Sequence, residues 1–365
     1  MSPLLKRVQQ AGIEGVKGKA NPVQITPADF FTPTEALRGL FAKLIHCPDP
    51  RQIVIIPSVS YGIATAAKNI NLKHGERVVV LAEQFPSNYY QWHRLCDENG
   101  GELVVVKAPD SEHRGAAWNE RLLEAIDDNT RVVAIPHVHW ADGTLFDLKA
   151  IRKKCNAVGA FLIIDGTQSV GALPMDIAEV QPDALICAGY KWLLGPYSLG
   201  LAYFGERFNN GVPLEENWIN RADSENFAGL VNYNRDYQDG ALRYEVGEHS
   251  NFILVPMLTE ALRQINDWGV ASIQQYCQRL FTDTLTTLPK ERFIIEEEAY
   301  RSHHLFGIRL KQAAHMEALK QHLQEEKISV SIRGNAIRVA PHVYNDAPDI
   351  AKFTAALMSI YEKGR

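Results

Sequence analysis

Short apolar runs alternate with helix-like stretches from about residue 50 to residue 205. The runs are rich in β-branched residues and read QIVIIPS, ERVVVLAE, ELVVVKAP, TRVVAIPHV, AFLIIDG, ALICAGY and LGLAYF. Stretches such as SYGIATAAKNI, SNYYQWHRLCDENG and FDLKAIRKKCNAVG separate most of them. Strands that are apolar throughout are expected where both faces of a sheet are covered. The pattern therefore predicts an α/β fold, with a mostly parallel sheet wrapped by helices.

The pattern changes after residue 205. Residues 206–246 carry few strand signals and are rich in Asn, Asp and Tyr, which predicts surface or interface loops. After Pro256, two helical stretches precede the segments HLFGIRL, HMEALKQHLQEE, ISVSIRGNAIRVAP and DIAKFTAALMSIYEKG, an α+β pattern with antiparallel strands. We predict a large domain of residues 17–250 and a smaller C-terminal domain of residues 251–365. The N-terminal residues 1–16 are predicted to belong to the smaller domain.

Composition narrows the class of protein. The 365 residues include 38 Lys and Arg against 43 Asp and Glu, a net charge of -5 that disfavours binding to a nucleic acid. Mean hydropathy is -0.19, and no apolar run approaches the roughly 18 residues of a membrane-spanning helix. The N-terminal MSPLLKRVQQ lacks the apolar core of a secretion signal. We expect a cytoplasmic protein that binds neither nucleic acid nor membrane.

The cysteines and the missing motifs exclude further classes. Cys47, Cys96, Cys155, Cys187 and Cys277 are odd in number, scattered and never in a C-x-x-C pair, so we expect buried free thiols and no disulfide or zinc framework. The phosphate-binding motifs G-x-x-x-x-G-K-[ST] and G-x-G-x-x-G are absent, as are H-E-x-x-H and G-x-S-x-G. Kinase, GTPase, dehydrogenase, zinc-protease and serine-hydrolase readings are therefore disfavoured.

Two charged residues follow neighbouring apolar runs. Asp165 ends FLIID, and Lys191 comes 26 residues later, just after ALICAGY. A buried lysine whose charge is disfavoured forms Schiff bases, and pyridoxal phosphate needs both such a lysine and an acidic partner for its pyridinium nitrogen. Spacing alone leaves an alternative open, in which Asp165 begins a turn and Lys191 extends to the surface.

A longer stretch resembles a known family. The run IIDGTQSVGALPMDIAEVQPDALICAGYKWLLGPYSLGLAYF resembles the cofactor-lysine region of the class V aminotransferases. This fold-type I pyridoxal phosphate group includes cysteine desulfurases, isopenicillin N epimerase-like proteins and kynureninase. EQFPSNYYQW, SNF at 250–252 and GNAIRVAPHVYNDAPDIAKF extend the resemblance over most of residues 50–365. It implies a fold-type I transferase with pyridoxal phosphate as cofactor.

The resemblance implies roles for individual residues around the cofactor. Lys191 would hold the cofactor as an internal aldimine and move protons, Asp165 would pair with the ring nitrogen, and Gln168 would bind the ring oxygen. The remaining implied cofactor contacts are Phe85 for stacking and Ser60, Tyr190 and Ser250 for the phosphate, the last from a neighbouring subunit. Many relatives carry Ser where this chain has Ala188, so one phosphate contact must come from elsewhere.

The implied substrate contacts lie in three segments. Arg338 would grip the substrate α-carboxylate with a bidentate fork. Asn251, His139 and Trp140 complete the predicted substrate-binding set. Relatives often carry Asn in the segment where this chain has His139 and Trp140, so these two residues leave the reaction specificity open.

Several functions remain compatible with these residues. The main prediction is an aminotransferase that passes the amino group of an amino acid to a 2-oxo acid, as a homodimer with active sites at the subunit interface. A carbon–sulfur lyase, an epimerase and a kynureninase-like hydrolase share the same residues. Persulfide chemistry is disfavoured because SVSIRGNAIR has no cysteine before Arg338. Two other classes stay open: a metal-dependent hydrolase built on His137, His139 and Asp165, and a non-catalytic binding module.

Overall fold

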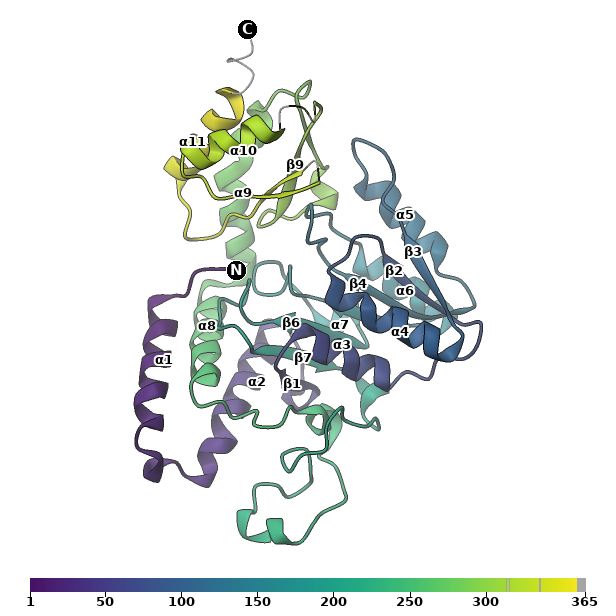
Figure 1. The fold of residues 1–365 in the computed structure, drawn as a ribbon, viewed down its shortest axis with the longest axis vertical. Coiled ribbons are helices and arrows are strands. Elements are labelled where there is room, and N and C mark those ends of the chain that lie inside the picture. Colours follow the sequence, from purple (N-terminus) through teal and green to yellow (C-terminus); the bar gives the residue numbers. More distant parts are fainter. Residues whose placement is uncertain (313, 315, 335, 360–365) are drawn as a thin grey trace.

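The computed structural model describes residues 1–359 except residues 313, 315 and 335. The last residues of the predicted closing helix, 360–365, lie outside the described part. Two sheets organise the chain, and the larger one lies in the N-terminal two-thirds (Figure 1).

The large sheet has seven strands in the order β1-β7-β6-β5-β4-β2-β3. Strand β7 runs antiparallel to β1 and β6, and the pairs β2–β3, β2–β4, β4–β5 and β5–β6 are parallel. The prediction of a mostly parallel sheet is confirmed. The strands are β1 (Ile53–Ile56), β2 (Arg77–Leu81), β3 (Glu102–Val106), β4 (Thr130–Pro136), β5 (Phe161–Asp165), β6 (Ala184–Ala188) and β7 (Gly200–Phe204).

Both faces of this sheet are buried. In β1, Ile53 and Ile55 belong to one apolar core, whereas Val54 and Ile56 belong to another on the opposite face, as the two-residue period of a strand requires. The helices of this part are α2 (Thr32–Leu44), α3 (Val59–Lys68), α4 (Tyr90–Asn99), α5 (Gly115–Ala125), α6 (Leu148–Val158) and α7 (Ile177–Val180). Single-turn 3₁₀ helices are η1 (Pro22–Gln24), η2 (Pro27–Phe30), η3 (Pro50–Gln52) and η4 (Pro86–Asn88).

The C-terminal part is α+β, as predicted. Its antiparallel sheet has the order β10-β11-β9-β8 and a separate apolar core that includes Phe281, Ile308, Leu319 and Phe353. Its elements are α9 (Val270–Thr287), β8 (Phe293–Ile295), η8 (Glu298–Tyr300), β9 (Phe306–Leu310), α10 (Met316–Glu325), β10 (Ser331–Arg333), β11 (Ala336–Val339) and α11 (Ala347–Ser359).

Helices α1 (Lys6–Lys19) and α8 (Leu254–Trp268) run side by side beside the large sheet (Figure 1). Val8 of α1 and Leu258 and Leu262 of α8 are buried in the same core as one face of the large sheet. Packing thus groups both helices with the large core, and the domain boundary at 250/251 stays a prediction.

Residues 206–246 form the loops that the sequence predicts. They contain only the short helices η5 (Glu206–Phe208), η6 (Phe227–Val231) and η7 (Gly240–Tyr244), together with an isolated bridge between Arg221 and Tyr237. Among the described residues, no helix combines the length and the apolar character needed to cross a membrane.

Candidate active site

A cavity of about 260 Å³ opens at one edge of the large sheet. Pro136, Asp165 and Ala188, the last residues of β4, β5 and β6, line it, and so does Leu199, which directly precedes the antiparallel β7. Ligands in α/β folds collect at this edge because the carboxyl ends of parallel strands meet there. The two strand ends that the sequence singled out therefore open into one pocket.

Asp165 is buried and lines the pocket. One of its carboxylate oxygens accepts a hydrogen bond from the backbone N–H of Thr167 at 3.0 Å. Burial raises the pKa of Asp165, although the contacts with Thr167 and the charge of Lys191 act in the opposite direction. A carboxylate whose charge is costly in the protein alone is stabilised when a cation binds beside it.

Lys191 lines the same pocket, as the sequence predicted. Burial lowers its pKa, and the charge of Arg338 lowers it further, against the opposing effect of Asp165. Its Nζ lies 5.3 Å from the centre of the Phe85 ring and 5.8 Å from that of Tyr190. A lowered pKa makes the neutral amine, which is the nucleophilic form, more available.

Ser58 and Ser60 form the end of the pocket at the N-terminus of α3. Ser58 caps the helix by accepting a hydrogen bond from the N–H of Tyr61 at 3.2 Å, and its hydroxyl lies 2.9 Å from that of Ser60. Free N–H groups and the helix dipole favour an anion at such a position. Ser60 and Tyr190, both predicted phosphate contacts, line the cavity, and so does Ala188.

Gln168 lines the pocket and is buried. Its Oε1 accepts a hydrogen bond from the indole Nε1 of Trp192 at 3.1 Å. No described residue accepts a hydrogen bond from the other end, Nε2. The side chain can therefore donate a hydrogen bond to a ligand in the cavity.

Trp140 lines the pocket and contacts Arg338 of the small sheet. The Trp140 ring meets Phe85 edge to face at 5.6 Å, and its indole donates to the carbonyl of Glu83 at 2.6 Å. Arg338, on β11, donates from NH1 to the carbonyl of Trp140 at 2.6 Å and is half-buried. The guanidinium thus lies beside the pocket wall.

Ser250 and Asn251 do not line this pocket. Ser250 donates to the carbonyl of Phe30, and Asn251 accepts hydrogen bonds from the N–H groups of Ile253 and Leu254 at the start of α8. Both line a separate cavity of about 250 Å³ beside α1. Their predicted contacts with cofactor and substrate are therefore not made within one chain.

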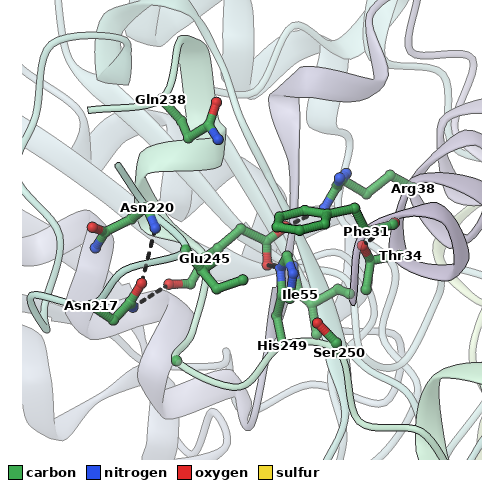
Figure 2. Close-up of polar contacts among 12 residues, drawn as sticks. Phe31, Thr34, Arg38, Ile55, Asn217, Asn220, Gln238, Glu245, His249 and Ser250 are labelled. Atoms are coloured by element: carbon green, nitrogen blue, oxygen red, sulfur yellow. Dashed lines mark hydrogen bonds and ion pairs between the residues drawn. The ribbon is translucent and has the colours of Figure 1, made fainter. Parts of the chain in front are cut away.

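A buried ionic cluster holds the chain just before Ser250 (Figure 2). Glu245 accepts a hydrogen bond from Arg38 at 2.6 Å and another from the N–H of Ile55 at 3.2 Å, and His249 Nδ1 lies 3.1 Å from its second oxygen. Burial alone would raise the pKa of Glu245, but His249 and Arg38 outweigh it and hold the pKa below its usual value. The cluster joins α2, β1 and the segment that leads to α8.

His139 is also absent from the pocket, contrary to its predicted role. The lining residues are Pro136, Val138 and Trp140, so the strand-like alternation turns His139 the other way. His139 is fully buried, with Nε2 3.2 Å from the carbonyl of Ala82, Nδ1 3.3 Å from Asp142 and its ring against Trp118. His139 therefore packs behind the residues that line the pocket.

The metal site considered for His137, His139 and Asp165 does not form. Neither histidine lines the pocket that Asp165 lines. Within residues 1–359, leaving out the three positions that the structure does not describe, no group of three or more His, Cys, Asp or Glu is arranged to hold a metal ion. Burial lowers the pKa of His137 to about 4, so this imidazole is neutral near pH 7.

Comparison with known proteins decides the family. Residues 13–356 match the sequence model described as Aminotransferase class-V. The chain belongs to the class V aminotransferase family. The uncharacterized aminotransferase YcbU of Bacillus subtilis (strain 168) is 28% identical over 314 residues, 86% of this chain and 80% of YcbU.

Other similar proteins differ in the activity that their names print. A probable cysteine desulfurase of Methanothermobacter thermautotrophicus (strain ATCC 29096 / DSM 1053 / JCM 10044 / NBRC 100330 / Delta H) is 33% identical over 152 residues, 42% of this chain and 37% of that protein. The cystine C–S lyase C-DES, in complex with its product cysteine persulfide, matches the fold with a TM-score of 0.82 at 19% identity, over 97% of this chain and 94% of that one. The predicted fold-type I class is thereby confirmed.

Class V enzymes depend on pyridoxal phosphate, and another C-DES structure, with a TM-score of 0.81, holds glycine linked to that cofactor. The pocket of this chain fits the group. It combines a buried carboxylate for a pyridinium nitrogen, a lysine of lowered pKa for an aldehyde and a helix N-terminus for a phosphate. Each of these three protein groups matches one functional group of the cofactor.

Several pocket residues were missed at the sequence level. Ser58, Thr167, Tyr197 and Ser198 line the cavity, and Thr167 also accepts a hydrogen bond from the N–H of Ala188 at 3.2 Å. Only Ser58 carried a local signal, because a serine between a strand and a helix is a typical N-cap. The hydroxyl of Ser2 donates to the carbonyl of Lys191 at 2.7 Å, a contact that no pattern indicates.

Proposed function

We propose that this class V enzyme is an aminotransferase that moves the amino group of an α-amino acid to a 2-oxo acid. The observation that carries the proposal is the buried pair of Asp165, at the end of β5, and Lys191, just after the neighbouring β6. Both line the same cavity of about 260 Å³. When bound, the cofactor supplies an electron sink for the bonds of the substrate α-carbon.

Each residue then has a distinct task. Lys191 would hold the cofactor and, as a neutral amine, would move the proton at the substrate α-carbon. Asp165 would pair with the protonated ring nitrogen, and Phe85, which also lines the pocket, would contact the ring. Arg338 binds the substrate carboxylate, because its guanidinium lies beside the pocket and has no carboxylate partner among the described residues.

A carbon–sulfur lyase is the second candidate, supported by the likeness to C-DES. The buried state of all five cysteines disfavours the version of this chemistry that passes sulfur to a cysteine of the protein. An epimerase and a kynureninase-like hydrolase use the same pocket residues and remain alternatives.

The test is the visible absorption spectrum of the purified protein with added pyridoxal phosphate, during titration with single amino acids. Conversion to the pyridoxamine form, reversed by a 2-oxo acid, supports the aminotransferase. Release of pyruvate from cysteine or cystine supports the lyase, release of alanine from kynurenine supports the hydrolase, and racemised substrate supports the epimerase. Any of these three without half-transamination refutes the main proposal.

We also propose a homodimer in which Ser250 and Asn251 reach the pocket of the other subunit. The support is that both residues lie outside the pocket of their own chain, next to an aromatic cluster of Phe30, Trp218 and Phe252. Light scattering that finds only monomer at micromolar concentration would contradict it. The five buried free cysteines confirm the sequence prediction and are compatible with the proposed cytoplasmic location.

A further inference from the structure

We propose that Trp192 is a positioning residue, which fixes the side-chain amide of Gln168 so that its N–H end, and not its carbonyl oxygen, faces the cofactor pocket. The inference deepens the proposed function but does not depend on which amino acid reacts. It rests on a chain of hydrogen bonds in which the donor and the acceptor can be assigned. The assignment starts from N–H groups that can donate but cannot accept.

The first such group is the indole of Trp192. An indole N–H donates and cannot accept, so the Gln168 atom 3.1 Å away must be the carbonyl oxygen Oε1. Both side chains are buried, and turning the amide over would bring two N–H donors together without water between them. Because Oε1 points to Trp192, we infer that Nε2 is the end of the amide that faces the cavity lined by Gln168.

A second chain of bonds holds the backbone of Gln168 from the small-domain side. The backbone N–H of His303 donates to Oε1 of Gln274 at 3.1 Å, which identifies the other end of that amide, Nε2, as the donor. This Nε2 lies 2.8 Å from Nδ1 of His304, so Nδ1 accepts. The remaining ring N–H of His304 then donates to the carbonyl of Gln168 at 2.7 Å.

The neutral form of His304 is what this chain requires. Burial lowers the pKa of His304 to about 3, so the ring stays neutral over the working range of the enzyme. The ring also packs edge to face against Trp192, with 4.6 Å between centres. Helix α9, which carries Gln274, is therefore linked through His304 to both the backbone and the side-chain partner of Gln168.

The consequence is electrostatic. An N–H directed at the ring oxygen of the cofactor stabilises negative charge on that oxygen, whereas a carbonyl oxygen in its place would repel it. The charged and titratable groups that share the pocket are Asp165, Lys191, Tyr190 and Tyr197, with Arg338 and the amino group of Met1 beside it. The orientation of Gln168 therefore affects the pH at which the visible band of the Lys191-bound cofactor changes.

The experiment is a spectrophotometric pH titration of the cofactor-loaded protein without substrate. W192F removes the indole N–H and keeps an aromatic ring, and we expect it to raise the titration midpoint by roughly 0.5–1 unit, the equivalent of one neutral hydrogen bond. The matched control is W118F, which removes an indole N–H that donates to the buried carbonyl of Val106 at 3.1 Å, and the midpoint should stay at the wild-type value. A midpoint that W192F leaves unchanged would overturn the proposal.

Two further variants separate positioning from a general structural effect. In a Gln168→Ala background, W192F should add no further shift, because the amide through which it acts is gone. An equal shift in both backgrounds would show that Trp192 acts by another route. If W192F does not fold, Q168A by itself tests the orientation, since the midpoint rises when a donated N–H is removed and falls when a carbonyl oxygen is removed.

We expect Q168A to raise the midpoint above the wild-type value, and an unchanged or lowered midpoint contradicts the assigned orientation. The readout also separates this inference from the proposed function. A failed aminotransferase assay leaves the titration intact, whereas a wild-type protein with no visible band refutes the cofactor pocket itself.

Discussion

Replacing Arg38 by methionine is expected to lower the free energy of unfolding by about 3–5 kcal/mol, the usual cost of leaving one partner of a buried ion pair uncompensated. The guanidinium of Arg38 lies 2.6 Å from Glu245, and the two side chains are only 8% and 2% exposed. Without Arg38, the Glu245 charge keeps the N–H of Ile55 and the neighbouring His249, which do not replace the lost cation.

Urea denaturation at pH 7, followed by circular dichroism, measures the effect through the shift in midpoint at a constant slope. The control is Arg94→Met, since Arg94 and Glu98 also lie 2.6 Å apart but are 70% and 55% exposed. Loss of that exposed pair should lower the free energy of unfolding by only about 0.3–0.5 kcal/mol. Similar losses in both variants would refute the reasoning that burial, and not distance, sets the magnitude.

The pH dependence gives a second check. The folded pKa of Glu245 is below its ordinary 4.5, so this group adds stability that is present above pH 4.5 and lost as the pH falls through the folded value. In R38M the folded pKa of Glu245 rises, because burial is then opposed only by His249 and the N–H of Ile55. The stability gap between wild type and R38M should therefore narrow as the pH falls through the folded pKa of Glu245 in R38M, which lies above that of the wild type.

Substitutions in the pocket have separate expected effects. Lys191→Ala should retain the circular dichroism spectrum but lose borohydride-fixed cofactor, and fixation on the variant would identify a different lysine. Asp165→Asn should lower kcat roughly 10- to 150-fold, the worth of a charged hydrogen bond, and an unchanged kcat contradicts its role. Arg338→Lys should raise KM for the amino acid by roughly 10-fold or more, while the exposed Arg333→Lys should not, and equal effects of the two would reject the carboxylate assignment. Because the pKa of Lys191 is lowered, cofactor capture by the apoprotein should reach its plateau rate below pH 10.5 in stopped-flow absorbance, and a midpoint at or above that pH would show an ordinary lysine.

The residues at strand ends were accessible from the sequence. Continuous apolar runs identified β5 and β6 as buried strands, and the parallel order implied that Asp165 and the segment leading to Lys191 emerge at the same edge. Long-range pairs were not accessible. Arg38 and Glu245 are 207 residues apart, and no local pattern on either segment indicates that the fold brings them together.

The segment after β4 shows why the prediction for His139 was wrong. A two-residue period correctly separates residues 137 and 139 from residues 138 and 140, but it does not say which set faces the ligand. That choice depends on what lies behind the wall, and here Trp118, Asp142 and the carbonyl of Ala82 accommodate the imidazole. Trp140 then faces the cavity, so half of the predicted pair was in place.

The thiols bear most directly on reaction specificity. A desulfurase that passes sulfur to its own cysteine needs a thiolate that reaches the substrate, but Cys187, on the strand that ends at the pocket, is fully buried, and burial raises its pKa well above the usual value. The other four cysteines are buried as well. If this enzyme cleaves a carbon–sulfur bond, the sulfur must therefore leave on a small molecule, as the persulfide product held by C-DES does. Substituting Cys187 by alanine should accordingly leave the turnover of cysteine or cystine unchanged, and a loss of turnover without loss of bound cofactor would reopen the role of a protein thiol.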